Sequence, residues 1–412
     1  MQLGNGTKSP GDLDKTFAID GRIEIAQRGT ANAIASDKYG GLILAVQENN
    51  RFVLSRFDIN GVKDLSFQET IANFVDGDIS IPARILVQED GNIILLGISI
   101  MDRIQSPVVM KFSNKGVPNL VFGRRILPVP DESVMPFITR KFLDGCLQHG
   151  DKILIMACHK TGQSERPLSR LYCLEGNGEF DKNFGDQSGF FEVKLHGHPS
   201  YVTDVQTQQS GIIILAGSWR FPGEPNRTRT VARYTPEGGL DTTFARAGFA
   251  DIPVPEESNI EPTDLNLTEP VNRVYVQKDD KILIAGHFNG RTDVGSALLA
   301  RLDRNGSVDA GFNGGAALIL SQPSKSLTFT SIAVQTDEKI VVVGGGDIGG
   351  VTKEYYVRLS ADGTPEDFQR EDSDGDCSDV VVQPSGRIVI SGSSGKRATG
   401  VRYPRVSGRL GN

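Results

Sequence analysis

The segment ILVQEDGNIILLG at residues 85–97 is the clearest copy of a pattern that recurs along this chain of 412 residues. An apolar strand leads into a tight polar turn, and a second, more apolar strand follows and ends in glycine. The D-G, D-D, D-E and S-G pairs at these turns tolerate the positive φ angles of a two-residue hairpin. A strand that is apolar at every position is typical of burial on both faces, as between stacked sheets. Further copies lie at 274–286, 332–344 and 380–392, and weaker ones at 34–46, 143–157 and 205–217.

Two other patterns accompany each hairpin. One is a glycine followed six residues later by phenylalanine, as in GDLDKTF ending at Phe17 and GSVDAGF ending at Phe312. The other is a short strand with Arg or Lys before an aromatic residue or Leu, as in VARY at 231–234. Each pattern occurs seven times, although the last phenylalanine, Phe368, follows its glycine one residue sooner. The repeat of about 58 residues therefore holds four strands, which is the content of one β-propeller blade.

These counts predict an all-β, seven-bladed β-propeller with four-stranded blades. The chain opens with the glycine–phenylalanine pattern and the strand GRIEIA at 21–26, whereas it closes with the third pattern at 401–408. We expect the N-terminal strand to complete the C-terminal blade and close the ring, because closure removes exposed sheet edges. Residues 1–412 are expected to form a single domain, with residues 1–10 as a flexible tail.

Two polar residue types repeat together with the hairpins. In several copies an acidic residue stands three positions before the phenylalanine, where its carboxylate can cap a short turn while the ring fills the space between sheets. A glutamine stands just before the turn in six of the seven hairpins, and we expect its amide to satisfy backbone groups of a turn. Both roles are structural. The residues concerned are Asp14, Asp181, Asp241 and Asp309, and Gln88, Gln148, Gln208, Gln277, Gln335 and Gln383.

Taken in order and spacing, the three patterns resemble the bacterial delta-60 repeat family, whose consensus runs LDxxFG, QxDGKILVAG and ALARLxxDG. The resemblance extends over nearly the whole chain, with degenerate copies at Phe67, Phe122 and Phe368. It implies a propeller. It implies no particular activity, since the family has no established common chemistry.

Composition limits the partners that the chain can have. A formal net charge of −7 argues against nucleic-acid binding through a general positive field. No segment approaches the roughly 18–20 apolar residues of a membrane span, and the start MQLGNGTKSP lacks the apolar stretch of a signal peptide. We expect a monomer without membrane insertion, cytoplasmic by default, although a chain exported by another route would look the same.

Cysteine and histidine residues do not form a recognisable metal motif. Cys146, Cys158, Cys173 and Cys377 show neither a CxxC pair nor a zinc spacing. Buried free thiols are expected, with a disulfide between two of them as the alternative. The HxH sequence His196–His198 has no third ligand nearby in the sequence, so a surface loop is expected there.

Function is expected on one face of the propeller, where the loops after the second strand and the links between blades vary in length. The loop at 218–230 contains the only tryptophan, beside aromatic and arginine residues that often anchor interfaces. The longest link, at 255–270, is acidic. The tryptophan could equally cover an apolar blade edge, and the acids could be solvated loop charge. The predicted partner-binding residues are Trp219, Arg220, Phe221, Arg227, Arg229, Glu256, Glu257, Glu261 and Asp264.

A calcium site is an alternative at the link DSDGD, since carboxylates at alternate positions can converge on one ion. Asp372, Asp374 and Asp376 would be its ligands. An EF-type loop would need glycine at Cys377 and glutamate at Gln383, so the match to that loop fails. The default expectation is that no cofactor is bound.

The function predicted from these observations is a non-enzymatic binding or scaffolding module that binds a protein partner through its variable face. The first alternative is a hydrolase or a lactonase-like enzyme with a metal at the central channel, although no GxSxG elbow or phosphate-binding glycine loop is present. The second alternative is a carbohydrate-binding lectin. A single tryptophan and 7% aromatic residues disfavour repeated sugar-stacking sites.

Overall fold

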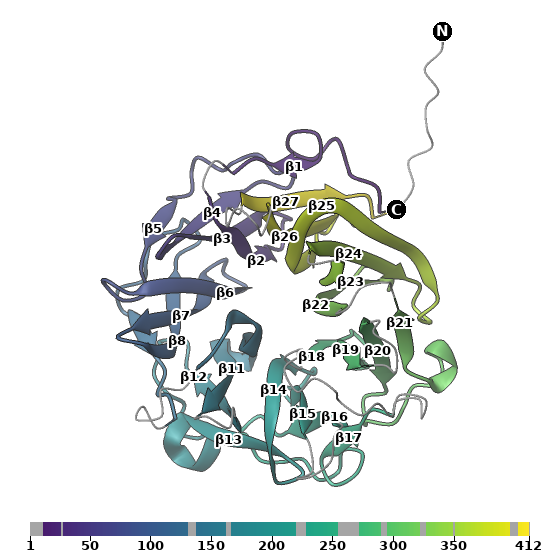
Figure 1. Cartoon of the computed structure of the whole chain (residues 1–412). Helices are drawn as coiled ribbons and strands as arrows, with labels where there is room; N and C mark the ends of the chain where they lie inside the picture. Colours follow the sequence, from purple (N-terminus) through teal and green to yellow (C-terminus); the bar gives the residue numbers. More distant parts are fainter. Residues whose placement is uncertain are drawn as a thin grey trace.

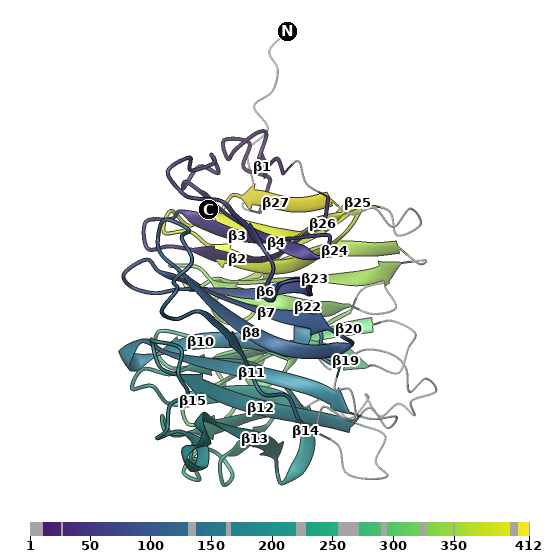
Figure 2. The ribbon, with the colours of Figure 1, turned by 90° about the vertical axis from the view of Figure 1, so that its left-hand side faces the viewer.

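A computed structural model of the whole chain shows β-sheets arranged around a centre, with the first strand of each hairpin nearest to it (Figure 1). In the view turned by 90°, the strands of successive sheets lie above one another (Figure 2). The residues that the structure describes are 11–25, 28–130, 137–161, 166–219, 228–253, 272–289, 295–321, 327–348, 351–395 and 403–411.

Three repeats form separate antiparallel sheets of four strands, each strand pairing with the next in sequence. The first is β2 (Thr30–Ser36), β3 (Leu42–Glu48), β4 (Arg51–Phe57) and β5 (Thr70–Ala72). The second is β6 (Ile79–Val87), β7 (Ile93–Met101), β8 (Ile104–Phe112) and β9 (Arg124–Ile126). The third is β18 (Asn272–Val276), β19 (Ile282–Asn289), β20 (Gly295–Leu302) and β21 (Leu318–Ser321).

A further sheet of eight strands consists of two groups of four. The groups are joined by a tight hairpin between β13 and β14, which pair only through Lys194 with Pro199 and Leu195 with His198. The strands are β10 (Leu143–Gln148), β11 (Lys152–Thr161), β12 (Arg166–Leu174), β13 (Phe190–Leu195), β14 (His198–Thr207), β15 (Ile213–Trp219), β16 (Thr228–Tyr234) and β17 (Phe249–Asp251).

The last sheet joins the two ends of the chain. Its long strand β25 (Pro365–Val382) pairs with β24 up to Asp374 and with β26 from Gly375, so it is the outer strand of one group and the inner strand of the next. β1 (Arg22–Ile23) pairs with β27 through Arg22 with Ser407 and Ile23 with Val406. The other strands are β22 (Thr328–Val334), β23 (Ile340–Ile348), β24 (Val351–Leu359), β26 (Ile388–Ser394) and β27 (Tyr403–Arg409).

Helical turns are few and short. They are η2 (Arg140–Phe142), η3 (His149–Asp151), η4 (Gly185–Gly189) and η6 (Asn313–Gly315). None of the helices within the described ranges has the length and apolar character needed to cross a membrane. The all-β prediction is confirmed, and each of the seven hairpins quoted above is an antiparallel strand pair.

The core lies between neighbouring sheets. Leu96 of β7 and Ile155 of β11 belong to one buried cluster, and Ile214 of β15 and Ile284 of β19 belong to another. Apolar side chains on both faces of these strands explain the continuous apolar runs in the sequence. All four cysteines are buried and none of them forms a disulfide, as expected.

The repeated phenylalanines and aspartates have the structural roles that the sequence predicts. Phe244 is fully buried, and the guanidinium of Arg233 lies 4.8 Å from the centre of its ring. Asp241 accepts a hydrogen bond from the Thr243 amide at 3.0 Å and pairs with Arg233 at 2.8 Å. Equivalent caps are made by Asp14, Asp181 and Asp309.

The turn glutamines connect neighbouring repeats. The side-chain amide of Gln148 donates a hydrogen bond to the backbone carbonyl of Gly211 at 2.7 Å. The side-chain amide of Gln208 donates one to the backbone carbonyl of Asp280 at 2.9 Å. The expected role in satisfying turn backbone groups is therefore confirmed for these residues, and each turn lies in the following repeat.

Candidate functional site

The inner strands place one residue each at a common position around the centre. This residue stands four positions before the turn glutamine or, in the first repeat, four before Asp37. Five of the seven residues are charged. We call the set the central ring, and it consists of Ala33, Arg84, Asp144, Asp204, Arg273, Ser331 and Asp379.

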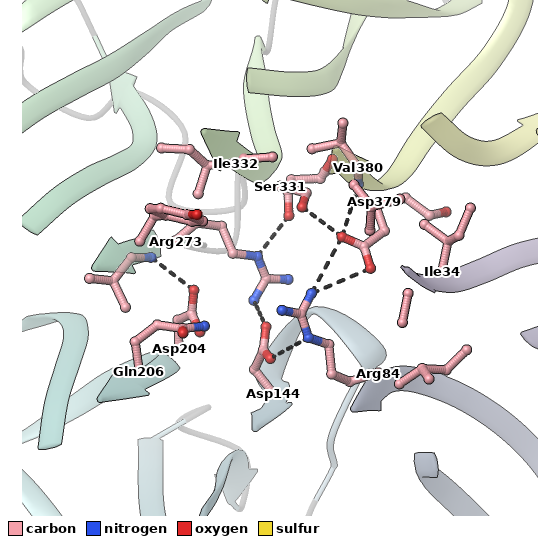
Figure 3. A pocket seen from close by; sticks show the side chains of 18 of the residues that line it. Ile34, Arg84, Asp144, Asp204, Gln206, Arg273, Ser331, Ile332, Asp379 and Val380 are labelled. Carbon is pink, nitrogen blue, oxygen red and sulfur yellow. Dashed lines mark hydrogen bonds and ion pairs between the residues drawn. The ribbon is translucent and has the colours of Figure 1, made fainter. Parts of the chain in front are cut away.

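A bulge directs several of these side chains. The strand register shifts immediately before Ala33, Arg84, Asp204, Ser331 and Asp379. A β-bulge bends the strand and re-aims the side chain that follows it. Figure 3 shows the side chains of Arg84, Asp144, Arg273 and Asp379 pointing towards one another from different inner strands.

Each ring aspartate is oriented by its own backbone. One carboxylate oxygen accepts a hydrogen bond from the amide of the next residue, at 2.7 Å in Asp144, 2.7 Å in Asp204 and 2.9 Å in Asp379. Ser331 also donates its hydroxyl to Asp379 at 2.6 Å. Bonds of this kind stabilise the charged form of a carboxylate and restrict its rotamer.

Ion pairs link ring residues across the centre. Nε of Arg84 lies 3.3 Å from Oδ1 of Asp144, and its Nη1 lies 3.4 Å from Oδ2 of Asp379. Nη1 of Arg273 lies 2.9 Å from Oδ2 of Asp144. The Arg84 side chain is the most exposed of this group, at 28%. Its contacts at 3.3–3.4 Å are long for charge-assisted hydrogen bonds.

Among the described residues, the guanidinium of Arg273 donates its hydrogen bonds to groups other than its neighbour Asp204. Besides Asp144, it donates through Nε to the carbonyl of Thr330 at 2.7 Å and through Nη1 to that of Thr203 at 3.2 Å. Asp204 has no ion pair within the described part of the chain, and its second oxygen accepts the amide of Val274 at 2.8 Å. Burial and the nearby charge of Asp144 raise the pKa of Asp204 to about 8.

The ring borders a pocket of about 300 Å³, which is the lower end of the size of small-molecule sites. Gln206, Tyr275 and Ser378 also line it, and so does Arg140 of η2. Ser378 is 6% exposed, and its hydroxyl has no hydrogen-bond partner among the described residues. Buried polar groups of proteins normally have such a partner.

Sequence reasoning missed the central ring. Its members differ from repeat to repeat, so no motif marks them. A signal was present: aligning the hairpins on the turn glutamine, or on Asp37 in the first repeat, places two arginines and three aspartates in one column of otherwise apolar strands.

Trp219 is buried, at 5% exposure, in β15. Its Nε1 donates to the Thr230 hydroxyl at 3.0 Å, and its ring stacks on that of His198 with 5.0 Å between centroids. This burial fits the alternative that it covers an apolar blade edge, and its role as a partner anchor stays a prediction. Arg229 is half-buried in β16, and burial lowers its pKa to about 10.

The remaining predicted partner-binding residues cannot be placed relative to the pocket. They lie outside the described residues, and they are Arg220, Phe221, Arg227, Glu256, Glu257, Glu261 and Asp264.

The predicted calcium ligands lie in strand β25, which corrects their assignment to a link between blades. Asp374 stands opposite Lys353, and Asp376 stands opposite Ser393. The side chains of Asp372 and Asp374 are outside the described part. Asp376 accepts the Ser393 hydroxyl at 3.1 Å and lies 4.0 Å from Nη2 of Arg140. Within the described ranges, no group of three metal-ligating side chains is found.

The histidines of the HxH sequence lie at the β13–β14 hairpin. Nε2 of His196 is 3.0 Å from Oδ1 of Asp251, and its ring packs on those of Trp219 and Phe249. The two histidines therefore flank a buried tryptophan, and the imidazole of His196 is paired with a carboxylate.

Comparisons with known proteins show the fold. Residues 277–312 match the model of a family described as a domain of unknown function (DUF5122) beta-propeller. No curated protein matches the chain. The fold is similar to that of a catalytically inactive virginiamycin B lyase from Staphylococcus aureus with quinupristin, at 11% identity and a TM-score of 0.52, covering 94% of this chain and 98% of that one. It is also similar to an ulvan lyase of the polysaccharide lyase family PL25, at 10% identity and a TM-score of 0.50, with 95% of each chain covered. At these identities the likeness shows a β-propeller fold and nothing about the reaction.

Proposed function

We propose that this protein is a non-enzymatic binding module whose ligand site is the central ring and the pocket beside it. The scaffold of the proposal is a single seven-bladed propeller of delta-60 type, closed by β1. The pairing of β1 with β27 supports closure, and so does the ion pair of Asp14 with Arg387 at 2.7 Å.

The observation that carries the proposal is the charge of the ring. Arginine and aspartate side chains with exposures of only 6–28% border the pocket, and desolvation of such groups costs more than a surface ion pair returns. Ala33 occupies the same position in the first repeat, so the fold itself accepts a small apolar residue there. Charges retained at a cost in stability favour a role in recognition.

A protein remains the partner that we propose, as the sequence suggests. The variable loops would contact its surface while one of its side chains enters the pocket. Such a side chain would meet converging polar groups in a mainly pre-formed site, which is the usual design of a specific pocket.

One observation favours an enzymatic alternative. Asp204, whose pKa is raised by burial and by the charge of Asp144, borders the pocket, and a carboxyl group that keeps its proton near neutral pH can act as a general acid. This alternative predicts turnover of a bound ligand, which product analysis by mass spectrometry would reveal.

The test is a screen of charged and neutral small ligands by thermal shift, followed by calorimetry. Ligands of the ring should lose affinity by about tenfold or more in the double variant Arg84→Met, Asp379→Asn, because charge-assisted hydrogen bonds contribute about 1.5–3 kcal/mol. The matched control is Arg56→Met, Asp64→Asn, which removes an ion pair of 2.6 Å outside the channel. The proposal would be refuted if the screen finds no ligand, or if every ligand found binds the ring variant and the control variant with equal affinity.

A further inference from the structure

The central ring is one positive charge short. It holds three carboxylates, those of Asp144, Asp204 and Asp379, and two guanidiniums, those of Arg84 and Arg273. Asp144 takes ion pairs from both arginines, and Asp379 shares Arg84. Neither guanidinium makes an ion pair with Asp204 within the described part of the chain, although the charges of Arg273 and Arg84 act on its pKa from farther away.

Arg140 does not supply the missing charge. It is the third guanidinium bordering the pocket, and it lies 4.0 Å from Asp376, so the two charges offset each other. With all three carboxyl groups ionised, the ring carries an excess of one negative charge, which has the sign of the net charge of the chain, −7. A negative field of this kind attracts cationic ligands.

Asp204 has capacity for a further donor. Its two oxygens accept one backbone amide each, from Val205 and Val274, whereas an ionised carboxylate offers about four lone-pair sites. The carboxyl group borders the pocket although the residue is only 3% exposed. Gln206, two positions further along β14, lines the same pocket (Figure 3).

A second, independent feature indicates a missing hydrogen-bonding group. Ser378 lines the same pocket and is only 6% exposed. Its hydroxyl has no hydrogen-bond partner among the described residues. A ligand with N–H groups could donate a hydrogen bond to the hydroxyl oxygen of Ser378. The pocket of about 300 Å³ has room for such a group.

We infer that the pocket binds an organic cation, a primary ammonium or a guanidinium group, with Asp204 as its ion-pair partner. The inference rests on the proposed function and names the ligand chemistry of that site. The cation can belong to a free small amine or to a lysine or arginine side chain of a protein. In both cases it makes the positive and negative charges of the ring equal.

The state of Asp204 agrees with this role. Burial raises its pKa to about 8, so at pH 7 a proton occupies the carboxyl group in place of a cation. An incoming guanidinium favours the ionised form and displaces that proton into solution. Binding should therefore release protons at pH 7 and none at pH 9.5, where the group is already ionised.

The experiment is titration calorimetry at pH 7 in buffers of different ionisation enthalpy. The probes are agmatine, N-acetyl-arginine amide, the neutral N-acetyl-glutamine amide and the anionic N-acetyl-glutamate. We expect the guanidinium probes to bind with proton release, and Asp204→Asn to weaken them by about tenfold or more and abolish the release. The matched control Asp64→Asn should bind like the wild type. Should Asp204→Asn fail to fold, the loss of proton release at pH 9.5 in the wild type serves as the same test.

The outcomes separate the two proposals. Binding of N-acetyl-arginine amide supports the inference with a protein side chain as the source, and binding of agmatine alone supports it with a free amine. Binding of only the anionic or neutral probe, weakened by Arg84→Met, Asp379→Asn, overturns the cation inference and leaves the binding module standing. If no ligand responds to any ring variant, both proposals fail.

Discussion

The side-chain amide of Gln383 donates a hydrogen bond to the carbonyl of Gly40 at 2.6 Å, although the two residues are 343 positions apart. The same nitrogen reaches the carbonyl of Ile59 at 3.1 Å. The glutamine of the last hairpin thus contacts the turn of the first, in the same way as Gln148 contacts Gly211 between neighbouring repeats. The contact pattern continues across the two ends of the chain.

Deletion of residues 1–26 is expected to destabilise the whole protein. It removes the fully buried Phe17, the ion pair of Asp14 with Arg387, and the pairing of β1 with β27. Loss of a buried phenylalanine alone costs about 3–5 kcal/mol, so the melting temperature should fall steeply. The control is deletion of residues 1–10, for which we expect an unchanged melting curve. A near-normal curve for the longer deletion would contradict closure of the ring by β1.

Trp219→Ala is expected to reduce the free energy of unfolding by about 3–5 kcal/mol, because the side chain is 5% exposed and its indole nitrogen is hydrogen-bonded. Denaturant unfolding followed by circular dichroism measures the change. Tyr39→Ala is the control. Tyr39 is 76% exposed, so its substitution should reduce the free energy of unfolding only a little. Equal stability of Trp219→Ala and wild type would show instead that Trp219 is available for a partner.

Acid should destabilise the fold through His159. Its ring is fully buried in β11 without hydrogen-bond partners among the described residues, and burial lowers its pKa to about 3 from 6.5. As pH falls from about 6.5 to 3, this imidazole binds a proton in the unfolded chain but stays neutral in the folded chain. The free energy of unfolding therefore decreases across that pH range. One pKa unit corresponds to about 1.4 kcal/mol, so several kcal/mol are at stake.

The measurement is the free energy of unfolding against pH for the wild type and His159→Leu. The variant should lose less stability between pH 6.5 and 4 than the wild type. His149→Leu, at an exposed position, should follow the wild-type curve. Parallel curves for wild type and His159→Leu would exclude His159 as the cause.

Asp204 should produce a dependence of opposite sign. Its pKa is raised from 3.8 to about 8 in the folded chain, so folded protein holds a proton between these pH values that unfolded protein has released. The stabilising contribution is present below about pH 4 and is lost as pH rises through 8. In Asp204→Asn the loss of stability between about pH 4 and 8 should disappear. Melting curves recorded at several pH values would show this, even if the variant is less stable than the wild type at every pH. Retention of the full slope would mean that another group titrates there.

Local and repeated features could be read from the sequence. The hairpin at 85–97 is formed by β6 and β7, and the one at 332–344 by β22 and β23, because turn chemistry and unbroken apolar runs act within a few residues. The buried Phe244 and its capping Asp241 were recognisable in the same way, since a structural requirement of the repeat keeps the phenylalanine in every copy and the aspartate in several.

Features that depend on a single copy were not readable. Residues 372–376 look like a polar link, yet they form part of β25, because pairing with β24 on one side and β26 on the other extends the strand through them. The polar surroundings of Trp219 in the sequence similarly hid its burial, because the rings of His196 and His198 that pack on it come from the β13–β14 hairpin.

The sequence by itself determined the all-β class, the hairpins and the repeat unit, because each of these depends on short-range periodicity and on turn residues that recur. Only the tertiary structure decided the central ring. Arg84, Asp144 and Asp379 come from strands separated by up to 295 positions, and their contact exists only after the inner strands meet around one centre. The tertiary structure also sets the pKa of Asp204. Burial and a neighbouring carboxylate raise this pKa, and neither is a local property of the sequence.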